Sequence, residues 1–205
     1  IEEKRDFILN TKSTLDKSIY GHSDAKTHIL QVIGKWIKNP MSQGNVLALQ
    51  GPMGNGKTTL VKEGISKAIG RPFSFIALGG SSNGSILDGH NYTYVGSTWG
   101  KIVDILMEKK CMNPIIFIDE LDKVSRTEHG KEIIGILTHL VDTTQNMSFQ
   151  DKYFNGIDLD MSKVLFIFSY NDVSMIDKIL LDRIHRIKFD YLTIIDKQNI
   201  VSKFI

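Results

Sequence analysis

One octapeptide, Gly51–Thr58, holds the residue types needed to grip a chain of phosphates. It reads GPMGNGKT and fits the Walker A pattern, in which glycines let backbone N–H groups close on phosphate oxygens and the lysine reaches the terminal phosphates. The alternative is a glycine-rich turn that binds nothing, which would leave the lysine and threonine without a role. The predicted ligand is a nucleoside triphosphate, bound by Gly51, Pro52, Met53, Gly54, Asn55, Gly56, Lys57, Thr58 and Thr59.

The residues on either side of the octapeptide predict a strand before it and a helix after it. Val46–Gln50 is a short apolar run, and Thr58–Ile69 is helix-competent. A helix start leaves backbone N–H groups unpaired and carries partial positive charge, so an anion is held there. Lys57 adds a point charge, and the hydroxyl of Thr58 is predicted to bind Mg²⁺.

Two carboxylates follow four apolar residues in Ile115–Glu120, which has the form of a Walker B strand. Asp119 at the strand end can hold the Mg²⁺ shell, and Glu120 can orient and deprotonate the attacking water. The alternative is a buried strand that simply ends on polar residues. A Walker A pattern upstream, in the correct order, favours the catalytic interpretation.

Two further polar residues could contribute to hydrolysis. Asn171 follows the apolar run Val164–Phe168 and the polar Ser169-Tyr170, where its amide could sit between the terminal phosphate and the water, or it is an ordinary turn residue. Arg183 is predicted on a helix that reaches the domain edge, where a cation could stabilise charge on a neighbouring subunit's transferring phosphate. The alternative for Arg183 is a surface arginine paired with Asp182 or Asp177.

The remaining pattern predicts an α/β fold, with a parallel sheet of about five strands covered by helices on both faces, because near-continuous apolar strands alternate with helical stretches. A helix is expected over Glu2–Lys17, before a turn at Tyr20-Gly21. A second helix should begin at Ser23-Asp24 and end at Asn39-Pro40, and Gly79–Ser85 should be a loop. Further helices are predicted at Gly100–Lys110 and Lys131–Val141, and further strands at Phe73–Leu78, Ile115–Asp119, Val164–Ser169 and Ile187–Phe189.

Composition narrows the class of protein. With 25 basic and 23 acidic residues the net charge is +2, without the basic excess of a protein held mainly by nucleic-acid phosphates. The single cysteine, Cys111, excludes an internal disulfide and fits a reducing compartment. No apolar run could span a bilayer, and no signal-peptide pattern opens the chain. The expected protein is intracellular, cytoplasmic or in an organelle matrix, and not secreted.

Beside these motifs, a series of short segments resembles the AAA+ ATPase module of Lon-type ATP-dependent proteases, through nearly the whole chain from about Tyr20 onward. Several segments are specific to that family rather than shared by P-loop proteins in general. They are Leu78-Gly79-Gly80, Gly89-His90, Thr93–Gly96, Asn113-Pro114, Asp119–Lys123, Gln145-Asn146, Phe149–Tyr153, Asp160–Val164 and Leu181–Arg183.

The resemblance implies a ring-forming motor, usually a hexamer, that hydrolyses ATP at subunit interfaces and pulls unfolded or misfolded protein through a central pore. It implies ATP and Mg²⁺ as ligands. Asn171 matches the sensor-1 residue and Arg183 matches the arginine finger. Tyr20 and Gly21 match the stretch that lines the adenine pocket.

Tyr94 and Val95 match the substrate-gripping pore loop of the same family. An aromatic and a β-branched residue beside Gly96, in an otherwise polar loop, cost free energy when exposed unless they contact a partner. An unfolded chain would be such a partner. The alternative is that Tyr94 packs against its own domain, and Trp99 is expected to be a packing residue.

The resemblance also divides the chain into an N-terminal helical segment or linker at residues 1–20 and an AAA+ large domain at residues 21–205. The small helical domain and the protease domain of the family are not expected in this chain. Two other functions fit the same motifs. One is a stand-alone Lon-like unfoldase or remodeller, and the other is an AAA+ clamp or helicase loader, which the net charge of +2 does not favour.

Overall fold

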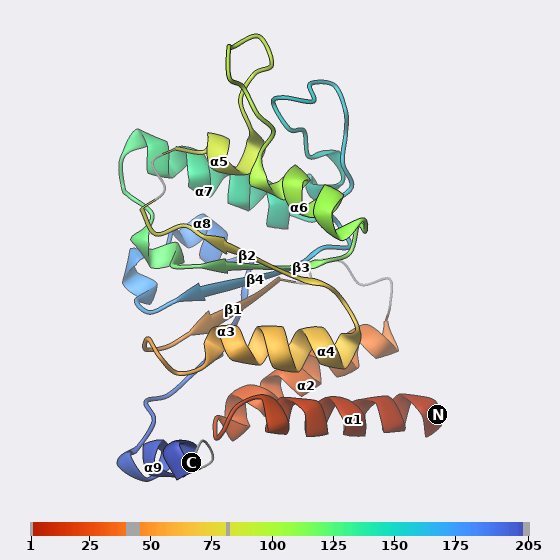
Figure 1. Ribbon diagram of the computed structural model, residues 1–205, viewed down its shortest axis with the longest axis vertical. Coiled ribbons are helices and arrows are strands. Elements are labelled where there is room, and N and C mark those ends of the chain that lie inside the picture. Colours follow the sequence, from red (N-terminus) through yellow and green to blue (C-terminus); the bar gives the residue numbers. More distant parts are fainter. Residues whose placement is uncertain (1, 40–45, 81–82, 203–205) are drawn as a thin grey trace.

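The computed structural model describes residues 2–39, 46–80 and 83–202 of the 205-residue chain. The domain limits at residues 1 and 205, the helix end expected at Pro40 and the loop residues Ser81 and Ser82 lie outside the described residues. The predicted α/β fold is confirmed, with one parallel sheet between two layers of helices (Figure 1). Across the described ranges, no helix combines the length and apolar character needed to cross a membrane.

The sheet has five strands in the order β2-β3-β4-β1-β5, and every neighbouring pair is parallel. The register pairs Gln50 with Tyr170 and Ala77 with Asp119, so neighbouring strands finish at one common edge. Ligands bind at the carboxyl edge of such sheets, because the loops that follow the strands gather there. The strands are β1 Val46–Gln50, β2 Phe73–Ala77, β3 Ile115–Asp119, β4 Leu165–Tyr170 and β5 His185–Lys188.

The strands differ from the prediction only at their ends. β1 and β3 have the predicted bounds. β2 ends at Ala77 instead of Leu78, and β4 is shifted by one residue toward the C-terminus. β5 begins at His185 rather than Ile187, because this edge strand has one buried residue and shows no apolar run that would mark its start.

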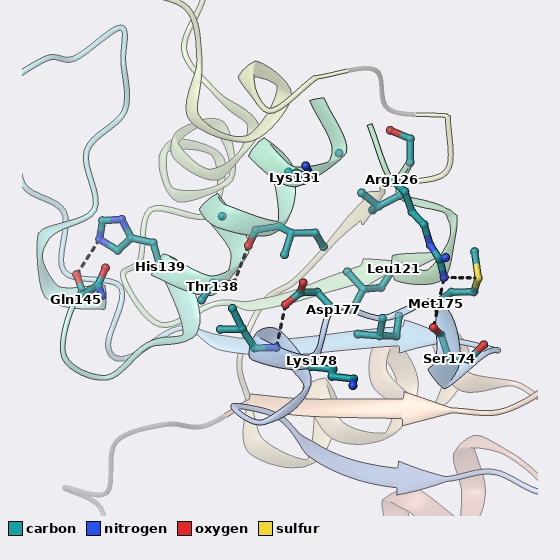
Figure 2. Close-up of a pocket in the computed structure, with 17 residues that line it drawn as sticks. Leu121, Arg126, Lys131, Thr138, His139, Gln145, Ser174, Met175, Asp177 and Lys178 are labelled. Atoms are coloured by element: carbon teal, nitrogen blue, oxygen red, sulfur yellow. Dashed lines mark hydrogen bonds between the residues drawn. The ribbon is translucent and has the colours of Figure 1, made fainter. Parts of the chain in front are cut away.

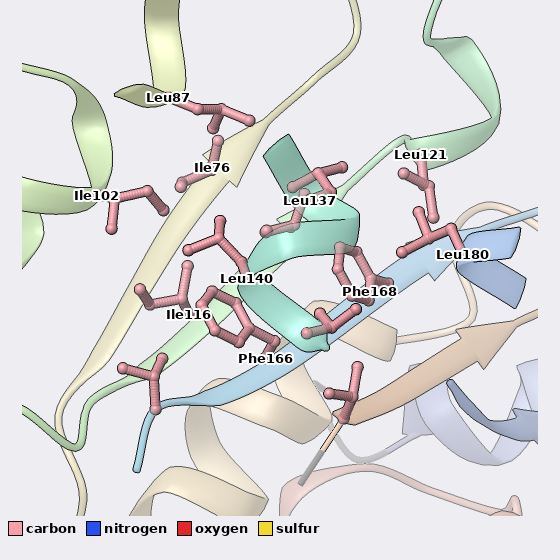
Figure 3. Close-up of a cluster of buried hydrophobic side chains, with 14 of the residues drawn as sticks. Ile76, Leu87, Ile102, Ile116, Leu121, Leu137, Leu140, Phe166, Phe168 and Leu180 are labelled. Carbon is pink, nitrogen blue, oxygen red and sulfur yellow. The ribbon is translucent and has the colours of Figure 1, made fainter. Parts of the chain in front are cut away.

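Helices α5, α6, α7 and α8 cover one face of the sheet (Figure 1). Phe166 and Phe168 of β4 point to this layer and pack with Leu137 of α7 (Figure 3). Leu165 and Ile167 belong to the core on the other face, because side chains alternate along a strand. The helices of this layer are α5 Ser85–Asp88, α6 Lys101–Lys109, α7 Glu128–Val141 and α8 Lys178–Leu181.

The opposite face is covered by α1 Glu2–Ser18, α2 Ser23–Lys38 and the helix that follows the phosphate-binding motif. That helix contains a π-helical segment, η1 Leu60–Ile65, between α3 Lys57–Thr59 and α4 Ser66–Ile69, which was not predicted. α1 crosses it at Gly64, where a Cβ would lie 2.9 Å from Ser18 Oγ, so the glycine permits the close approach. Leu15 of α1 therefore shares a core with Leu60.

Short elements complete the chain. Short 3₁₀ turns in the described ranges are η2 Leu121–Lys123, η3 Asn146–Ser148 and η4 Val173–Met175. The last helix, α9 Ile194–Ser202, was not predicted, because it buries no residue and so shows no apolar stripe. α7 begins at Glu128, earlier than the predicted Lys131.

Candidate nucleotide-binding site

A cavity of about 460 Å³ lies at the carboxyl edge of the sheet, between the loop after β1 and the ends of β3 and β4. It gathers residues that the sequence predicts from three separate motifs. Because Gln50 pairs with Tyr170, the loops that follow β1 and β4 start side by side at Gly51 and Asn171. The lining residues are Met53, Gly54, Asn55, Gly56, Lys57, Thr58, Thr59, Asp119, Glu120, Asp122, Ser169, Tyr170 and Asn171.

Lys57 is the buried cation of this cavity, with 8% of its surface exposed. Its Nζ donates to Gly51 O at 2.6 Å, to Pro52 O at 2.9 Å and to Asn171 Oδ1 at 3.4 Å. Burial lowers the pKa of the Lys57 ammonium, while nearby carboxylates, Asp119 first, raise it. One desolvated cation beside several acids suits a ligand that is itself both anionic and metal-bound.

Close packing and one side-chain bond hold the predicted phosphate-binding loop, residues 51–58, in place. Gly54 and Gly56 adopt φ values of +74° and +79°, which favour glycine. Gly51 approaches the backbone of Phe189, where a Cβ would lie 2.5 Å from the carbonyl oxygen. Asn55 donates from Nδ2 to Asp190 O at 2.6 Å. The loop is therefore anchored to the chain just after β5, and the helix over residues 57–69 starts directly from it.

The acidic end of β3 turns sharply. Asp119 Oδ1 accepts a hydrogen bond from Glu120 N at 2.9 Å, and Glu120 has φ +60°, which is uncommon outside glycine. The Glu120 carboxylate lies against Gly79, where an added Cβ would collide with Oε2. The sequence places Gly79 in an expected loop and in one of the Lon-like segments, and neither pattern explains why a glycine is needed there. The structure supplies its physical reason, which is room for the proposed catalytic carboxylate.

Asp122 is a further carboxylate on the cavity, and sequence reasoning gave it no role. It is 5% exposed, and its Oδ2 accepts hydrogen bonds from Asn171 N and Asp172 N, each at 3.3 Å. These are the first backbone N–H groups after β4, so Asp122 ties the turn after β3 to Asn171. Its place in a 3₁₀ turn has no periodic signal, so only its proximity to Asp119 in the sequence could have marked it.

A magnesium ion fits the donors on this cavity. The hydroxyl of Thr58 and the carboxylate of Asp119 are hard oxygen ligands that line the same space. Within residues 2–39, 46–80 and 83–202, no group of three or more His, Cys, Asp or Glu side chains forms a metal site by itself. Mg²⁺ needs no such cage, because it keeps several waters and binds through one or two protein ligands plus phosphates.

Comparison with known proteins agrees with this geometry. The family model for the ATPase family associated with various cellular activities (AAA) matches residues 47–191. The chain belongs to the AAA ATPase family. The matched range contains every residue that lines the 460 Å³ cavity. Membership of this family implies that the chain binds ATP.

The AAA ATPase chain also resembles Lon proteases over nearly its full length, as the sequence predicted. It is 40% identical to a Lon protease homolog of Acanthamoeba polyphaga mimivirus over 198 residues, which covers 96% of this chain and 19% of that protein. It is 36% identical to the Lon protease of Fusobacterium nucleatum over 191 residues, or 93% of this chain and 24% of that protein. A mitochondrial Lon protease homolog of Eremothecium gossypii is 36% identical over 196 residues, 96% of this chain and 18% of that protein. The chain thus spans about a fifth of the length of these relatives.

Arg183 lies away from the cavity of the AAA ATPase chain, in the turn between α8 and β5 and not on the helix as predicted. Its Nε and Nη2 donate to Asp142 Oδ2 at 3.2 Å and 3.0 Å, and its Nη1 donates to Ile179 O at 2.9 Å. The expected alternative partners, Asp182 and Asp177, are wrong. Asp177 instead caps α8, because its Oδ1 accepts from Ile179 N at 2.8 Å.

Tyr20 and Gly21 lie on two smaller cavities. Tyr20 lines one of about 270 Å³ together with Gly56 and Thr59 of the phosphate-binding loop. Its hydroxyl accepts a hydrogen bond from Asn199 Nδ2 of α9 at 2.9 Å. Gly21 lines the other, of about 180 Å³. Tyr20 therefore lies beside residues 54–56 and Thr59, whereas the adjacent Gly21 lines the other cavity.

The loop between α5 and α6 projects from the body of the molecule, at the top of Figure 1. Tyr94 is 69% exposed and Val95 is fully exposed, so the alternative that Tyr94 packs against its own domain is wrong. Trp99 packs at the base of the loop, as expected, with its ring stacked 6.0 Å from that of Phe154. Two apolar side chains are thus presented outward.

A larger cavity, of about 620 Å³, lies on the other side of η2, among α7, η4 and α8 (Figure 2). Leu121 lines it, whereas the next residue, Asp122, lines the nucleotide cavity. Arg126 crosses its wall and donates to Met175 Sδ at 3.2 Å. None of the site residues predicted from the sequence lines this cavity, so size alone does not mark the functional site.

Proposed function

We propose that this chain is the ATP-binding and ATP-hydrolysing AAA+ motor of a Lon-like protease, which unfolds and translocates protein substrates for degradation. The observation that carries the proposal is the convergence of Lys57, Asp119, Glu120 and Asn171 on one cavity. The similarity to Lon proteases over nearly the whole chain supports the choice of substrate. Peptide-bond cleavage is assigned to no residue of this cavity.

In the proposed bound state, the phosphates lie against the loop over residues 51–58 and the start of the helix that follows it. Unpaired N–H groups at a helix start favour an anion there. Lys57 gives up its bonds to Gly51 O and Pro52 O and donates to phosphate oxygens instead. Its Nζ already lies within hydrogen-bond distance of the loop that would hold the phosphates. Thr58 and Asp119 would hold Mg²⁺, which supplies positive charge to the phosphates during transfer.

Hydrolysis is proposed to depend on Glu120 and Asn171. The Glu120 carboxylate accepts the proton of the attacking water, and the carboxamide of Asn171 holds that water near the terminal phosphate. Both residues stand at strand ends whose positions the sheet register fixes. A preorganised pair of this kind spares the entropic cost of ordering the water during the reaction.

The proposed working form is a homo-oligomer, a hexameric ring in the full-length protein. Arg183 is proposed to stabilise phosphate charge in the neighbouring subunit, where an arginine finger contributes on the order of 10³ to 10⁵ in rate. Its exposed position outside its own cavity supports this role. Tyr94 and Val95 are proposed to grip the unfolded chain in the pore, which their exposure supports.

Tyr20 and Gly21 are proposed to contact the adenine. The support for Tyr20 is its place on a cavity beside Gly56 and Thr59. We place the protein inside the cell, in the cytoplasm or an organelle matrix, with no membrane and no nucleic acid among its partners. The balanced charge of the chain supports the last point.

The test is Glu120→Gln, which keeps the shape of the side chain and removes the base. We expect ATP affinity close to that of the parent and turnover lower by about 10² to 10⁴-fold. Glu128→Gln is the matched control, because Glu128 is exposed at the start of α7, pairs with Lys131 and does not line the nucleotide cavity. Turnover retained in the Glu120 variant would remove this residue from the base role.

A further inference from the structure

Asp122 joins two motifs of the proposed hydrolytic site. It lies in η2, directly after the left-handed turn at Glu120, and is 5% exposed. One carboxylate oxygen, Oδ2, accepts from two backbone N–H groups, while the other, Oδ1, is buried with no hydrogen-bond partner among residues 2–39, 46–80 and 83–202. Burying a polar oxygen without a hydrogen bond costs free energy. A buried carboxylate with one unpaired oxygen is hard to explain by packing alone.

The contacts of Asn171 supply another explanation. Its backbone N–H donates to Asp122 Oδ2 at 3.3 Å, and its Oδ1 accepts from Lys57 Nζ at 3.4 Å. β4 lies between β1 and β3 in the sheet, so the residue after β4 stands between the phosphate-binding loop and the acidic turn. The Asp122 bond thus adds to the sheet register a direct link between the turn at Asn171 and the turn after Asp119 and Glu120.

We propose that Asp122 is a positioning residue for ATP hydrolysis, which fixes the turn at Asn171 and Asp172 to the end of β3. Its role is to hold the Asn171 carboxamide and the Glu120 carboxylate toward the same water. This inference rests on the proposed ATPase function. Small misplacements of reacting groups lower rates steeply, so loss of the tie slows turnover more than it weakens nucleotide binding.

Asp151 offers a matched comparison within the same chain. It is 1% exposed, and its carboxylate accepts hydrogen bonds from Gly100 N at 2.7 Å and Tyr153 N at 2.9 Å. It does not line the nucleotide cavity. Removing Asp151 therefore reports what the loss of a buried backbone acceptor does to folding alone.

The experiment compares Asp122→Ala, Asp122→Asn and Asp151→Ala. Amide hydrogen exchange of the nucleotide-free protein should be faster at Asn171 and Asp172 in Asp122→Ala only. Steady-state ATPase assays should show kcat lower by about ten- to a hundredfold in Asp122→Ala, with KM and ATP affinity near those of the parent. Asp122→Asn keeps an acceptor oxygen and should retain the amide protection and most of the turnover. Asp151→Ala should lower the melting temperature and leave basal kcat unchanged.

Two results would overturn the inference. One is unchanged kcat in Asp122→Ala despite faster exchange at Asn171, because the tie would then have no part in catalysis. The other is a loss of turnover in Asp122→Asn equal to that in Asp122→Ala with protection intact, because the charge and not the position would then matter. A parent protein without ATPase activity would refute the proposed function instead, and the exchange data would still report on the tie.

Discussion

The nucleotide cavity and the loop between α5 and α6 are held in opposite ways. In the cavity, Lys57 and Asp122 are buried and bonded to backbone groups of the strand ends. In the loop, Tyr94 and Val95 are exposed and touch little of their own chain. In the first region, contacts within the chain hold the polar side chains in position without a ligand. The role proposed for the second region needs a partner from outside the chain, so the two regions call for different tests.

Removing the buried cation should break the first region most severely. Lys57→Ala is expected to weaken ATP affinity on the order of 10² to 10³-fold, because a desolvated charge contact to the phosphates is lost. Isothermal titration calorimetry with Mg²⁺ and a slowly hydrolysed ATP analogue measures it. Lys62→Ala, an exposed lysine of the same helix, is the control and should bind like the parent. ATP affinity equal to that of the parent in the Lys57 variant would contradict the proposal that this cavity binds the nucleotide.

A smaller but more specific effect is expected at Gly79. Gly79→Ala places a Cβ against Glu120 Oε2 and must move that carboxylate. We expect ATP affinity to be kept and kcat to fall by up to about a hundredfold, because the base is displaced rather than removed. Gly34→Ala in α2 is the control, since its Cβ meets no atom within 4 Å. A Gly79 variant with parental kcat would show that Glu120 can act from another position.

The parts of the site that local pattern could specify were predicted well. β1 and β3 have their predicted bounds, since both are buried apolar runs followed by chemically distinctive residues. The residues around Lys57 and Asp119 could be assigned to one ligand, because the Walker A and B patterns each encode a local conformation. Asn171 could be placed at the edge of the sheet from the run of apolar residues before it.

What the sequence could not supply depends on contacts between distant segments. The ion pair of Arg183 with Asp142 joins the turn after α8 to the end of α7. The sequence favoured Asp182 or Asp177 as its partner, because both lie closer to Arg183 along the chain. Gly79 must lack a side chain because the Glu120 carboxylate lies against it, and this contact joins two distant segments. Asp122 has the same character, since its bonds reach across to β4. Such residues carry no periodicity, so only the folded structure shows which residues they contact.

The second region can be tested without touching the first. Tyr94→Ala should keep basal ATP hydrolysis and lose the stimulation by an unfolded protein substrate, together with unfolding activity in the full-length protein. The reason is that the side chain lies far outside the nucleotide cavity and presents its apolar ring to solvent. Tyr92→Ala is the matched control, because Tyr92 is an exposed aromatic residue of the same loop. Equal losses in both variants would contradict a specific grip by Tyr94.

The smallest effect concerns the ion pair that holds Arg183. The pKa of Asp142 is lowered to about 2, first by the hydrogen bond from the Thr144 hydroxyl, then by that from Thr144 N and only after these by Arg183. A lowered pKa stabilises the fold above the ordinary value near 3.8, and this contribution disappears as the pH falls through about 2. Carboxyl NMR titration should therefore show a larger rise in the Asp142 pKa for Thr144→Ala than for Arg183→Ala.

The same titration includes its own control, because the pKa of Asp160 is lowered by Ser162 and should not respond to either substitution. If Thr144 is the stronger partner, Asp142 stays satisfied when Arg183 leaves it. Arg183 could then turn toward a phosphate in a neighbouring subunit, and breaking its ion pair with Asp142 would cost its own subunit little stability. A larger rise in Arg183→Ala would instead make the arginine a structural brace of the α7 end, and the finger would have to be sought elsewhere on this surface.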